Sequence, residues 1–423
     1  MLNKLLNKVN LNASYLKVKR NKGAGGVDGL GVNDLQNQLQ TSGANYLEQI
    51  SKSSYQTQPI LGVEIPKPNG KKRLLGIPTV VDRVFQQALQ QVLSPIFEPA
   101  FEDYSYGFRP NRNAGEAIAK SLEYINSGKR IVIDIDLKNF FDEINHDQLL
   151  SLIHRKVKCK ATLKLLRSFL RAPIQLNGKL HKRNKGVPQG SPLSPLLSNI
   201  YLNELDKELK KRGHKWIRYA DDFSIYVSSD LAAKRVMKSI VSFIEKKLKL
   251  PINREKSGIR KPHTFTILGH SFVSSYKKGS KGKYQLVVSK GSWQSLKSKL
   301  KLTTRKTIPM SFDERISRLN KLIRGWVNYF KSANIYGKLK QLDEWLRNRL
   351  RYCIWHHWKK PERKRKNLIR LGIKQGQAYA WSRTRMGGWA VAQSPILGTT
   401  ITIARLKQRG YLSLAEYYKQ RHH

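Results

Sequence analysis

The chain has 423 residues, of which 80 are lysine or arginine and 29 aspartate or glutamate, so its formal net charge is +51. No apolar run approaches the roughly 20 residues of a membrane-spanning helix, and two cysteines cannot build a disulfide framework or a cysteine-rich zinc site. So basic a protein needs a polyanionic partner, and nucleic acid fits better than a membrane surface because the basic residues are spread over the whole chain. We expect a cytoplasmic protein of two or three domains, with no membrane association.

The first predicted elements are helical patches over residues 1–60, interrupted by a glycine-rich loop at 21–31. The segment VEIPKPNGKKRLLGIPT (63–79) places turn residues between two β-prone runs, which predicts a hairpin with a basic tip. Residues 80–99 carry apolar residues at helical spacing, so we expect a helix that stops at its prolines.

Residues 130–150, RIVIDIDLKNFFDEINHDQLL, predict a short strand followed by a helix. Because side chains alternate along a strand, the isoleucines share one face, and Asp134 and Asp136 share the other. The stretch GVPQGSPLSPLLSNIYLNELDKELKK (186–211) begins with loop residues and continues with a helical stripe of leucines.

The segment RYADDFSIYV (218–227) predicts strand, tight turn and strand, with Asp221 and Asp222 at the turn. Two adjacent anions repel each other, and burial makes their joint ionisation costly, so the arrangement makes sense if a cation binds there. Oxygen ligands suit Mg²⁺, and two such ions about 4 Å apart can drive phosphoryl transfer. Taken alone, the pair is also explained by the preference of aspartate for turns.

Further along the chain, residues 230–250 predict an amphipathic helix, and 264–273 and 284–289 predict strands. Residues 315–358 predict helix, and the charge run 359–370 is a candidate boundary. The tail, 371–421, interleaves aromatic residues with arginines, which suits contact with nucleic acid.

The order of these motifs resembles the palm of reverse transcriptases: an aspartate-bearing strand, a Pro-Gln-Gly loop before a helix, and Tyr-x-Asp-Asp on a hairpin. Further blocks resemble the bacterial group II intron-encoded reverse transcriptases. These are NKGAGGVDG (21–29), IPKPNGKKRLLGIPTVVDRV (65–84), YGFRPNRNAGEAI (106–118), a helical thumb at 315–358, and AYAWSRTRMGGWAVAQSPIL (378–397), which is similar to their DNA-binding tail.

The resemblance implies an α+β, right-hand polymerase. Fingers and palm would span 1–290, with an N-terminal extension at 1–60, followed by a helical thumb or maturase domain at 291–370 and a basic DNA-binding region at 371–423. Many relatives add an endonuclease with paired cysteines, for which this sequence has no candidate. We therefore expect a member of the endonuclease-less group, similar to those of class C introns, with its primer supplied from elsewhere.

The same resemblance implies roles for individual residues. Asp136, Asp221 and Asp222 would be catalytic and hold two Mg²⁺ ions. Asp134 shares a strand face with Asp136, so it could contribute to the metal site or be only a supporting or solvent-facing acid. The nucleotide (dNTP) would be bound by Lys67, Arg73, Phe141, Gln189 and Gly190, with Phe141 excluding a 2′-hydroxyl. Template or RNA contacts would come from Arg109 and Arg112, and tail contacts with DNA from Trp381, Arg383, Arg385 and Trp389.

Several of these roles have alternatives. Lys71 and Lys72 could replace Lys67 and Arg73 at the triphosphate, Phe141 could be a core residue, and the tail tryptophans could pack against the thumb. Arg109 could equally be a solvated arginine.

The implied function is RNA-directed DNA synthesis on an RNA template from a DNA primer, together with binding of the group II intron RNA to assist splicing, and of target DNA. No obligate protein partner is evident. One alternative is the reverse transcriptase of a retron, a diversity-generating element or a CRISPR locus. Another is an RNA-binding maturase whose polymerase site is inert.

Overall fold

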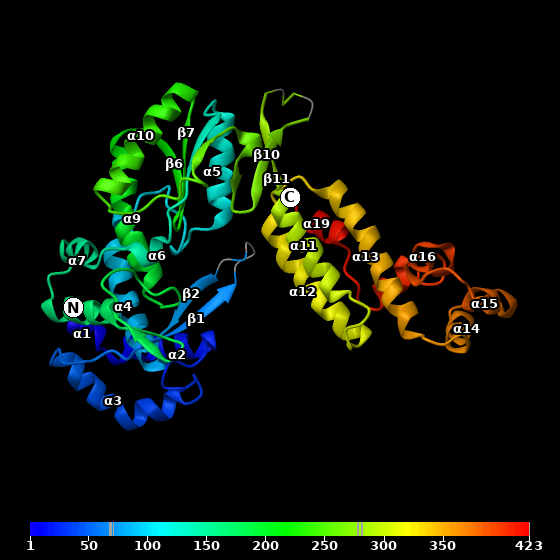
Figure 1. Cartoon of the computed structure of the whole chain (residues 1–423), viewed down its shortest axis with the longest axis horizontal. Coiled ribbons are helices and arrows are strands. Elements are labelled where there is room, and N and C mark those ends of the chain that lie inside the picture. Colours follow the sequence, from blue (N-terminus) through cyan, green and yellow to red (C-terminus); the bar gives the residue numbers. More distant parts are fainter. Residues whose placement is uncertain (67–69, 71, 277–278, 281, 423) are drawn as a thin grey trace. The chain divides into compact units, whose positions relative to one another are not determined.

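The computed structural model describes residues 1–66, 70, 72–276, 279–280 and 282–422, and Figure 1 shows the whole chain. The chain forms two compact units, Met1–Lys261 and Pro262–His423, which are described one after the other. Among the described residues, no helix combines the length and the apolar character needed to cross a membrane.

The first unit begins with helices that pack around a long buried helix. They are α1 (Leu2–Leu5), α2 (Lys8–Asn21), α3 (Leu35–Ser51) and the buried α4 (Val80–Phe97). Helix α4 continues through Pro95 and is followed by a 3-10 turn, Glu98–Ala100. The helix expected at 80–99 is therefore confirmed, but the expectation that it stops at its prolines is wrong at Pro95, which lies inside the last turn.

A four-stranded sheet lies beside these helices, in the order β2-β1-β4-β5. Its strands are β1 (Ile60–Pro66), β2 (Lys72–Ile77), β4 (Ile174–Leu176) and β5 (Lys179–His181). Strands β1 and β2 pair antiparallel from Leu61–Ile77 to Pro66–Lys72, which confirms the predicted hairpin. Lys67 and Lys71 fall outside the described residues.

A second four-stranded sheet, in the order β6-β7-β3-β8, carries the acidic motifs. Its strands are β6 (Lys215–Tyr219), β7 (Asp222–Val227), β3 (Ile131–Ile135) and β8 (Gly258–Arg260), all antiparallel to their neighbours. Helices α5 (Ala114–Asn126), α9 (Ser194–Lys211) and α10 (Asp230–Lys246) contact this sheet. The short α6 (Phe140–Glu143) follows β3 in the chain, α7 (His146–His154) packs against α9, and α8 (Lys160–Arg171) packs against α7 and α3.

The two faces of β3 are covered unequally. Ile131, Ile133 and Ile135 are buried in the main core. The other face is covered at one end by α5, whose Ser121 hydroxyl lies 2.7 Å from the Tyr226 hydroxyl on β7, and Val132 is fully buried there. Asp134 and Asp136 lie further along this face and remain half-exposed.

The second unit starts with a three-stranded sheet, in the order β11-β10-β9. Strands β9 (Thr266–Ile267) and β10 (His270–Ser274) form a hairpin around Leu268 and Gly269, both with positive φ, and β11 (Tyr284–Val288) completes the sheet. The single strand expected at 264–273 is thus wrong, because the chain reverses direction at Gly269.

The rest of the second unit is helical. Its main helices are α11 (Lys290–Thr303), α12 (Phe312–Phe330) and α13 (Tyr336–His357), and the charge run forms a further helix, α14 (Pro361–Arg370). The tail contains α15 (Gln375–Ser382), α16 (Gly388–Gln393), α17 (Pro395–Gly398), α18 (Ile403–Gln408) and α19 (Leu414–Arg421).

The end of the chain packs against helices α12 and α13 of the second unit. Asp343 on α13 is buried and accepts hydrogen bonds from the Tyr411 and Ser413 hydroxyls, both at 2.7 Å, and from the backbone N–H groups of Leu414 and Ala415. Residues 411–421 therefore share a compact unit with α12 and α13, and the two units meet at 261/262. The three-part division at 290 and 370 stays a prediction.

Candidate active site

Three aspartates from distant parts of the sequence gather at one end of the β3–β7 pair. The register pairs Asp134 with Ser224 and Ile135 with Phe223, so its continuation brings Asp136 beside Asp222. Strands β6 and β7 pair from Lys215–Tyr226 to Tyr219–Asp222, so only Ala220 and Asp221 form the turn between them. The fold thus brings Asp136 and the Asp221–Asp222 pair together.

The carboxylates of this cluster influence one another electrostatically. The pKa of Asp222 is raised to about 6. The larger cause is that surrounding protein displaces water from its carboxylate, although the side chain still reaches solvent, and the second cause is repulsion from Asp221, Asp136 and Asp134. Burial and the charge of Asp136 likewise raise the pKa of Asp221. Such a cluster is relieved by a bound cation.

Basic side chains lie around the aspartates. Arg260 on β8 pairs with Asp134 at 2.9 Å, and Lys256 lies 3.6 Å from the Asp136 carboxylate. Asp134 is thus already paired with an arginine. The Arg73 charge lowers the pKa of Asp221, which places the β2 strand within electrostatic reach of the turn.

The donor set fits a hard divalent cation. Within the described parts of the chain, no group of three or more Asp, Glu, His or Cys side chains is already arranged to hold a metal ion. Mg²⁺ does not require such a cage, because it binds through one or two carboxylates and completes its shell with water and substrate phosphates. The convergence of Asp136 with Asp221 and Asp222, whose negative charges repel one another, is the observation that favours a cation here.

A buried ion pair stabilises the turn between β6 and β7, and no signal in the sequence indicated it. Arg218 on β6 is fully buried and pairs with the equally buried Asp206 on α9, with contacts of 2.5–3.0 Å. Its Nη1 also donates to the Ala220 carbonyl at 2.8 Å and to Asn199 Oδ1 at 2.9 Å. Ala220 itself has φ +59°, so these bonds hold a strained turn in place.

The loop 104–108 packs against the same turn. The backbone N–H of Tyr106 donates to the Arg218 carbonyl at 2.8 Å, and Asn199 Nδ2 donates to the Gly107 carbonyl at 2.9 Å. A Cβ atom on Gly107 would overlap the backbone of Ala220 and lie 2.9 Å from the Tyr219 carbonyl carbon. Only glycine fits at this position.

The Pro-Gln-Gly loop is attached to strand β2. The backbone N–H of Gly76 donates to the Gln189 carbonyl at 2.8 Å. Gly190 has φ +121°, and a Cβ there would lie 2.9 Å from the Gly76 carbonyl oxygen, so the close approach requires glycine. The Pro-Gln-Gly loop is therefore hydrogen-bonded to strand β2, the strand that also carries Arg73.

Phe141 on α6 is half-buried and lies edge-on to Phe140, with ring centroids 5.2 Å apart. Its carbonyl accepts a hydrogen bond from the Val187 N–H at 2.6 Å, which joins α6 to the Pro-Gln-Gly loop. Phe141, Gln189 and Gly190 thus lie on neighbouring segments, whereas Lys67 is outside the described residues.

The two candidate template arginines hold the protein's own structure. The Arg109 side chain is only 5 % exposed, pairs with Glu98 at 2.8 Å and donates to the carbonyls of Glu102 and Ser105. This geometry gives Arg109 a structural role and leaves little of it free for a template. Arg112 pairs with Asp103 at 2.9 Å and lies over the Tyr106 ring.

The tail residues divide in a similar way. Trp389 is half-buried with its ring 5.8 Å from that of Tyr352 on α13, and Trp381 is also half-buried. Arg383 lies 4.0 Å over the Tyr379 ring and pairs with Glu362, whereas Arg385 is exposed. All four belong to the second unit.

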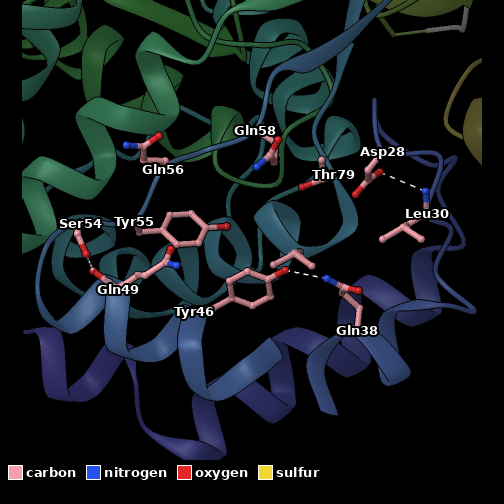
Figure 2. A pocket seen from close by; sticks show the side chains of 11 residues that line it. Asp28, Leu30, Gln38, Tyr46, Gln49, Ser54, Tyr55, Gln56, Gln58 and Thr79 are labelled. Carbon is pink, nitrogen blue, oxygen red and sulfur yellow. Dashed lines mark hydrogen bonds between the residues drawn. The ribbon is translucent and has the colours of Figure 1, made fainter. Parts of the chain in front are cut away.

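A pocket of about 660 Å³ lies between α3 and the start of α4, and none of the predicted site residues lines it. Figure 2 shows its polar lining, in which Gln38 donates to the Tyr46 hydroxyl. Beneath it, the Tyr55 hydroxyl donates to the buried Asp82 at 2.7 Å. This pocket belongs to the N-terminal helices and not to the acidic cluster.

Comparison with known proteins identifies two family models within the chain. Residues 65–272 match "Reverse transcriptase (RNA-dependent DNA polymerase)", and residues 293–372 match "Group II intron, maturase-specific domain". Among solved structures, a partial Cas6-RT-Cas1–Cas2 complex aligns with a TM-score of 0.37 and 23 % identity over 58 % of this chain and 42 % of that chain, a similarity too low to support a functional inference.

Three curated proteins show the relationship in sequence. Protein YkfC of Escherichia coli is 33 % identical over 289 residues, 59 % of this chain and 75 % of that protein. The group II intron-encoded protein LtrA of Lactococcus lactis is 31 % identical over 50 % of this chain, which spans 46 % of that longer protein. The retron Mx65 reverse transcriptase of Myxococcus xanthus is 28 % identical over 47 % of each chain. The chain belongs to the group II intron-encoded reverse transcriptases, a family of RNA-directed DNA polymerases.

Proposed function

We propose that the chain extends a DNA primer along an RNA template with dNTPs, using Asp136, Asp221 and Asp222 to hold two Mg²⁺ ions. The observation that supports this most directly is the strand register, which brings the β3 acid beside the acidic turn of β6 and β7. When bound, the ions would activate the primer hydroxyl and neutralise the leaving pyrophosphate.

The chain's own residues would position the nucleotide around this cluster. Arg73 would bind the triphosphate, because a guanidinium fork matches phosphate oxygens and its charge already reaches Asp221. The loop at Gln189 and Gly190, fixed to Gly76, would lie against the nascent base pair. Phe141 would sit under the sugar and exclude a 2′-hydroxyl, and Lys67 is proposed at the triphosphate from sequence alone.

We propose further that the protein binds its group II intron RNA, assists its splicing and contacts target DNA during retromobility. The match of residues 293–372 to the maturase-specific domain supports this over a retron or CRISPR-associated role, although a retron enzyme is among the relatives. Arg112 is proposed as an RNA contact, and Trp381, Arg383, Arg385 and Trp389 as DNA contacts.

The test compares Asp221→Ala with Asp230→Ala, which removes an exposed acid at the start of α10. Primer extension on an RNA template should fall by on the order of a hundredfold or more in Asp221→Ala, because a group that stabilises transition-state charge is lost. Asp230→Ala should retain wild-type synthesis.

Splicing of a group II intron RNA, measured in parallel, should survive in Asp221→Ala. Retained cDNA synthesis in this variant would refute the metal assignment. Loss of splicing with an unchanged melting temperature would show that the two activities are not separable.

A further inference from the structure

A second pocket, of about 330 Å³, lies within the second unit, Pro262–His423, which is mostly helical and is called the helical unit below. It lies where α12 begins, α13 ends and α14 passes, next to Arg409. Its lining includes two aromatic side chains, Phe312 and Trp358, and three arginines, Arg315, Arg363 and Arg409, and no acidic side chain. Its volume is at the lower end of the range for small-molecule sites. A cavity of this composition favours an anion that carries a flat ring.

Two of the arginines, Arg315 and Arg409, line the pocket and make contacts within the protein. Arg315 is buried and donates to the carbonyls of Thr303, Arg305 and Ile308, so it holds the loop before α12 without a carboxylate to neutralise it. Arg409 pairs with Asp313 at 2.6 Å and lies 4.6 Å over the Phe312 ring. Arg315 therefore adds a positive charge to the pocket wall that no carboxylate of the described residues neutralises, although its own donors are used by the backbone.

The remaining groups are available to a ligand. Arg363 is exposed, and no hydrogen bond or ion pair of its guanidinium is found in the described structure. One helical turn later, Asn367 uses its amide nitrogen on the Arg363 carbonyl, at 2.9 Å, and keeps its amide oxygen free to accept a bond. Trp358 is half-buried and presents part of its ring to the pocket.

We propose that this pocket binds one unpaired nucleotide, with its base stacked on Trp358 and its phosphate on Arg363. An aromatic surface, a guanidinium fork and an amide are the groups that proteins use for splayed-out bases of RNA. Nine of the ten lining residues fall within the segment matched by the maturase-specific model. We therefore assign the nucleotide to a bulge in bound RNA. This assignment rests on the RNA binding proposed above.

The test measures equilibrium binding by the full chain to two labelled hairpin RNAs that differ by one unpaired nucleotide. The buffer contains EDTA and no dNTP, so the result is independent of polymerase activity. The wild type should bind the bulged RNA about tenfold more tightly, as expected for one stacked base. Trp358→Ala should remove this preference, and Trp358→Phe should retain most of it.

The matched pair Arg363→Ala and Lys366→Ala separates the pocket from general charge. Both remove one exposed cation from α14, but Lys366 does not line the pocket. Arg363→Ala should reduce the ratio of the two affinities, whereas Lys366→Ala should weaken both RNAs equally. Because Arg363 is exposed, Arg363→Ala should not lower the melting temperature. It therefore tests the pocket even if Trp358→Ala destabilises the fold.

Equal affinity of the wild type for both RNAs would overturn the proposal, as would a preference that survives both Trp358→Ala and Arg363→Ala. Excess AMP should compete away the preference for the bulge in the wild type. Competition by AMP for this pocket without any bulge preference would identify a free nucleotide as the ligand and refute the RNA source. Failure of cDNA synthesis with an intact bulge preference would count against the proposed polymerase function only.

Discussion

At the scale of single residues, the buried acid Asp82 shows how the fold couples to pH. It lies in the first turn of α4, is 1 % exposed and accepts hydrogen bonds from the Tyr55 hydroxyl and the Gln58 N–H. Burial outweighs these bonds and raises the pKa of Asp82 to about 6. The folded state therefore binds a proton between about pH 6 and pH 4 that the unfolded state releases.

This linkage predicts a pH dependence of stability. Folding should gain stability as the pH falls from 7 towards 5, since protonation removes the cost of a buried charge. Asp82→Asn should flatten that part of the profile by on the order of 1–3 kcal/mol. Urea unfolding of the full chain at pH 5, 6 and 7 measures the free energy of unfolding at each pH, with Asp230→Asn as the control at an exposed acid. Parallel profiles for wild type and Asp82→Asn would contradict the assignment.

At the scale of elements, the acidic turn depends on a loop that carries no catalytic group. Gly107→Ala should push the loop 104–108 away from the turn, because the new methyl group overlaps the Ala220 backbone. Overpacking of this kind costs about 1–3 kcal/mol of stability. We expect primer extension to fall at least about tenfold as well, because small misplacements of reacting groups are costly.

The control for this prediction is Gly43→Ala, inside α3, where a Cβ meets nothing within 4 Å. It should leave synthesis unchanged and stabilise the helix by up to about 1 kcal/mol. Wild-type synthesis by Gly107→Ala would show that the loop does not position the turn.

Elements and residues differ in how far the sequence predicts them. The β6–β7 hairpin and the alternation on β3 were predictable because both signals lie within a few residues. The reversal at Gly269 was missed, although a glycine within a strand pattern is a warning of a bend. The Arg218–Asp206 pair and the burial of Arg109 could not be predicted, because partners are chosen by packing between distant elements.

At the scale of the whole molecule, the positive charge is distributed unequally. Residues 262–423 hold 35 of the 80 basic residues but only 6 of the 29 acidic ones, a net charge of +29, which leaves +22 for residues 1–261. The acidic cluster lies in the less basic unit. Affinity for nucleic acid should therefore come mainly from many separate phosphate contacts, with a larger share from the helical unit.

Such a protein should bind RNA with a steep salt dependence. Each neutralised phosphate releases counterions, so a protein with roughly 6–10 phosphate contacts loses about 10³–10⁵ in affinity between 50 and 200 mM salt. We expect the full chain to fall in this range with a paired hairpin RNA, measured by fluorescence anisotropy across a KCl series. Lys366→Ala should lower the slope of log K against log salt by about one or less, because no single contact dominates. A slope of two or three for the wild type would mean that most of the +51 charge does not face the RNA, and that affinity rests on a few local contacts instead.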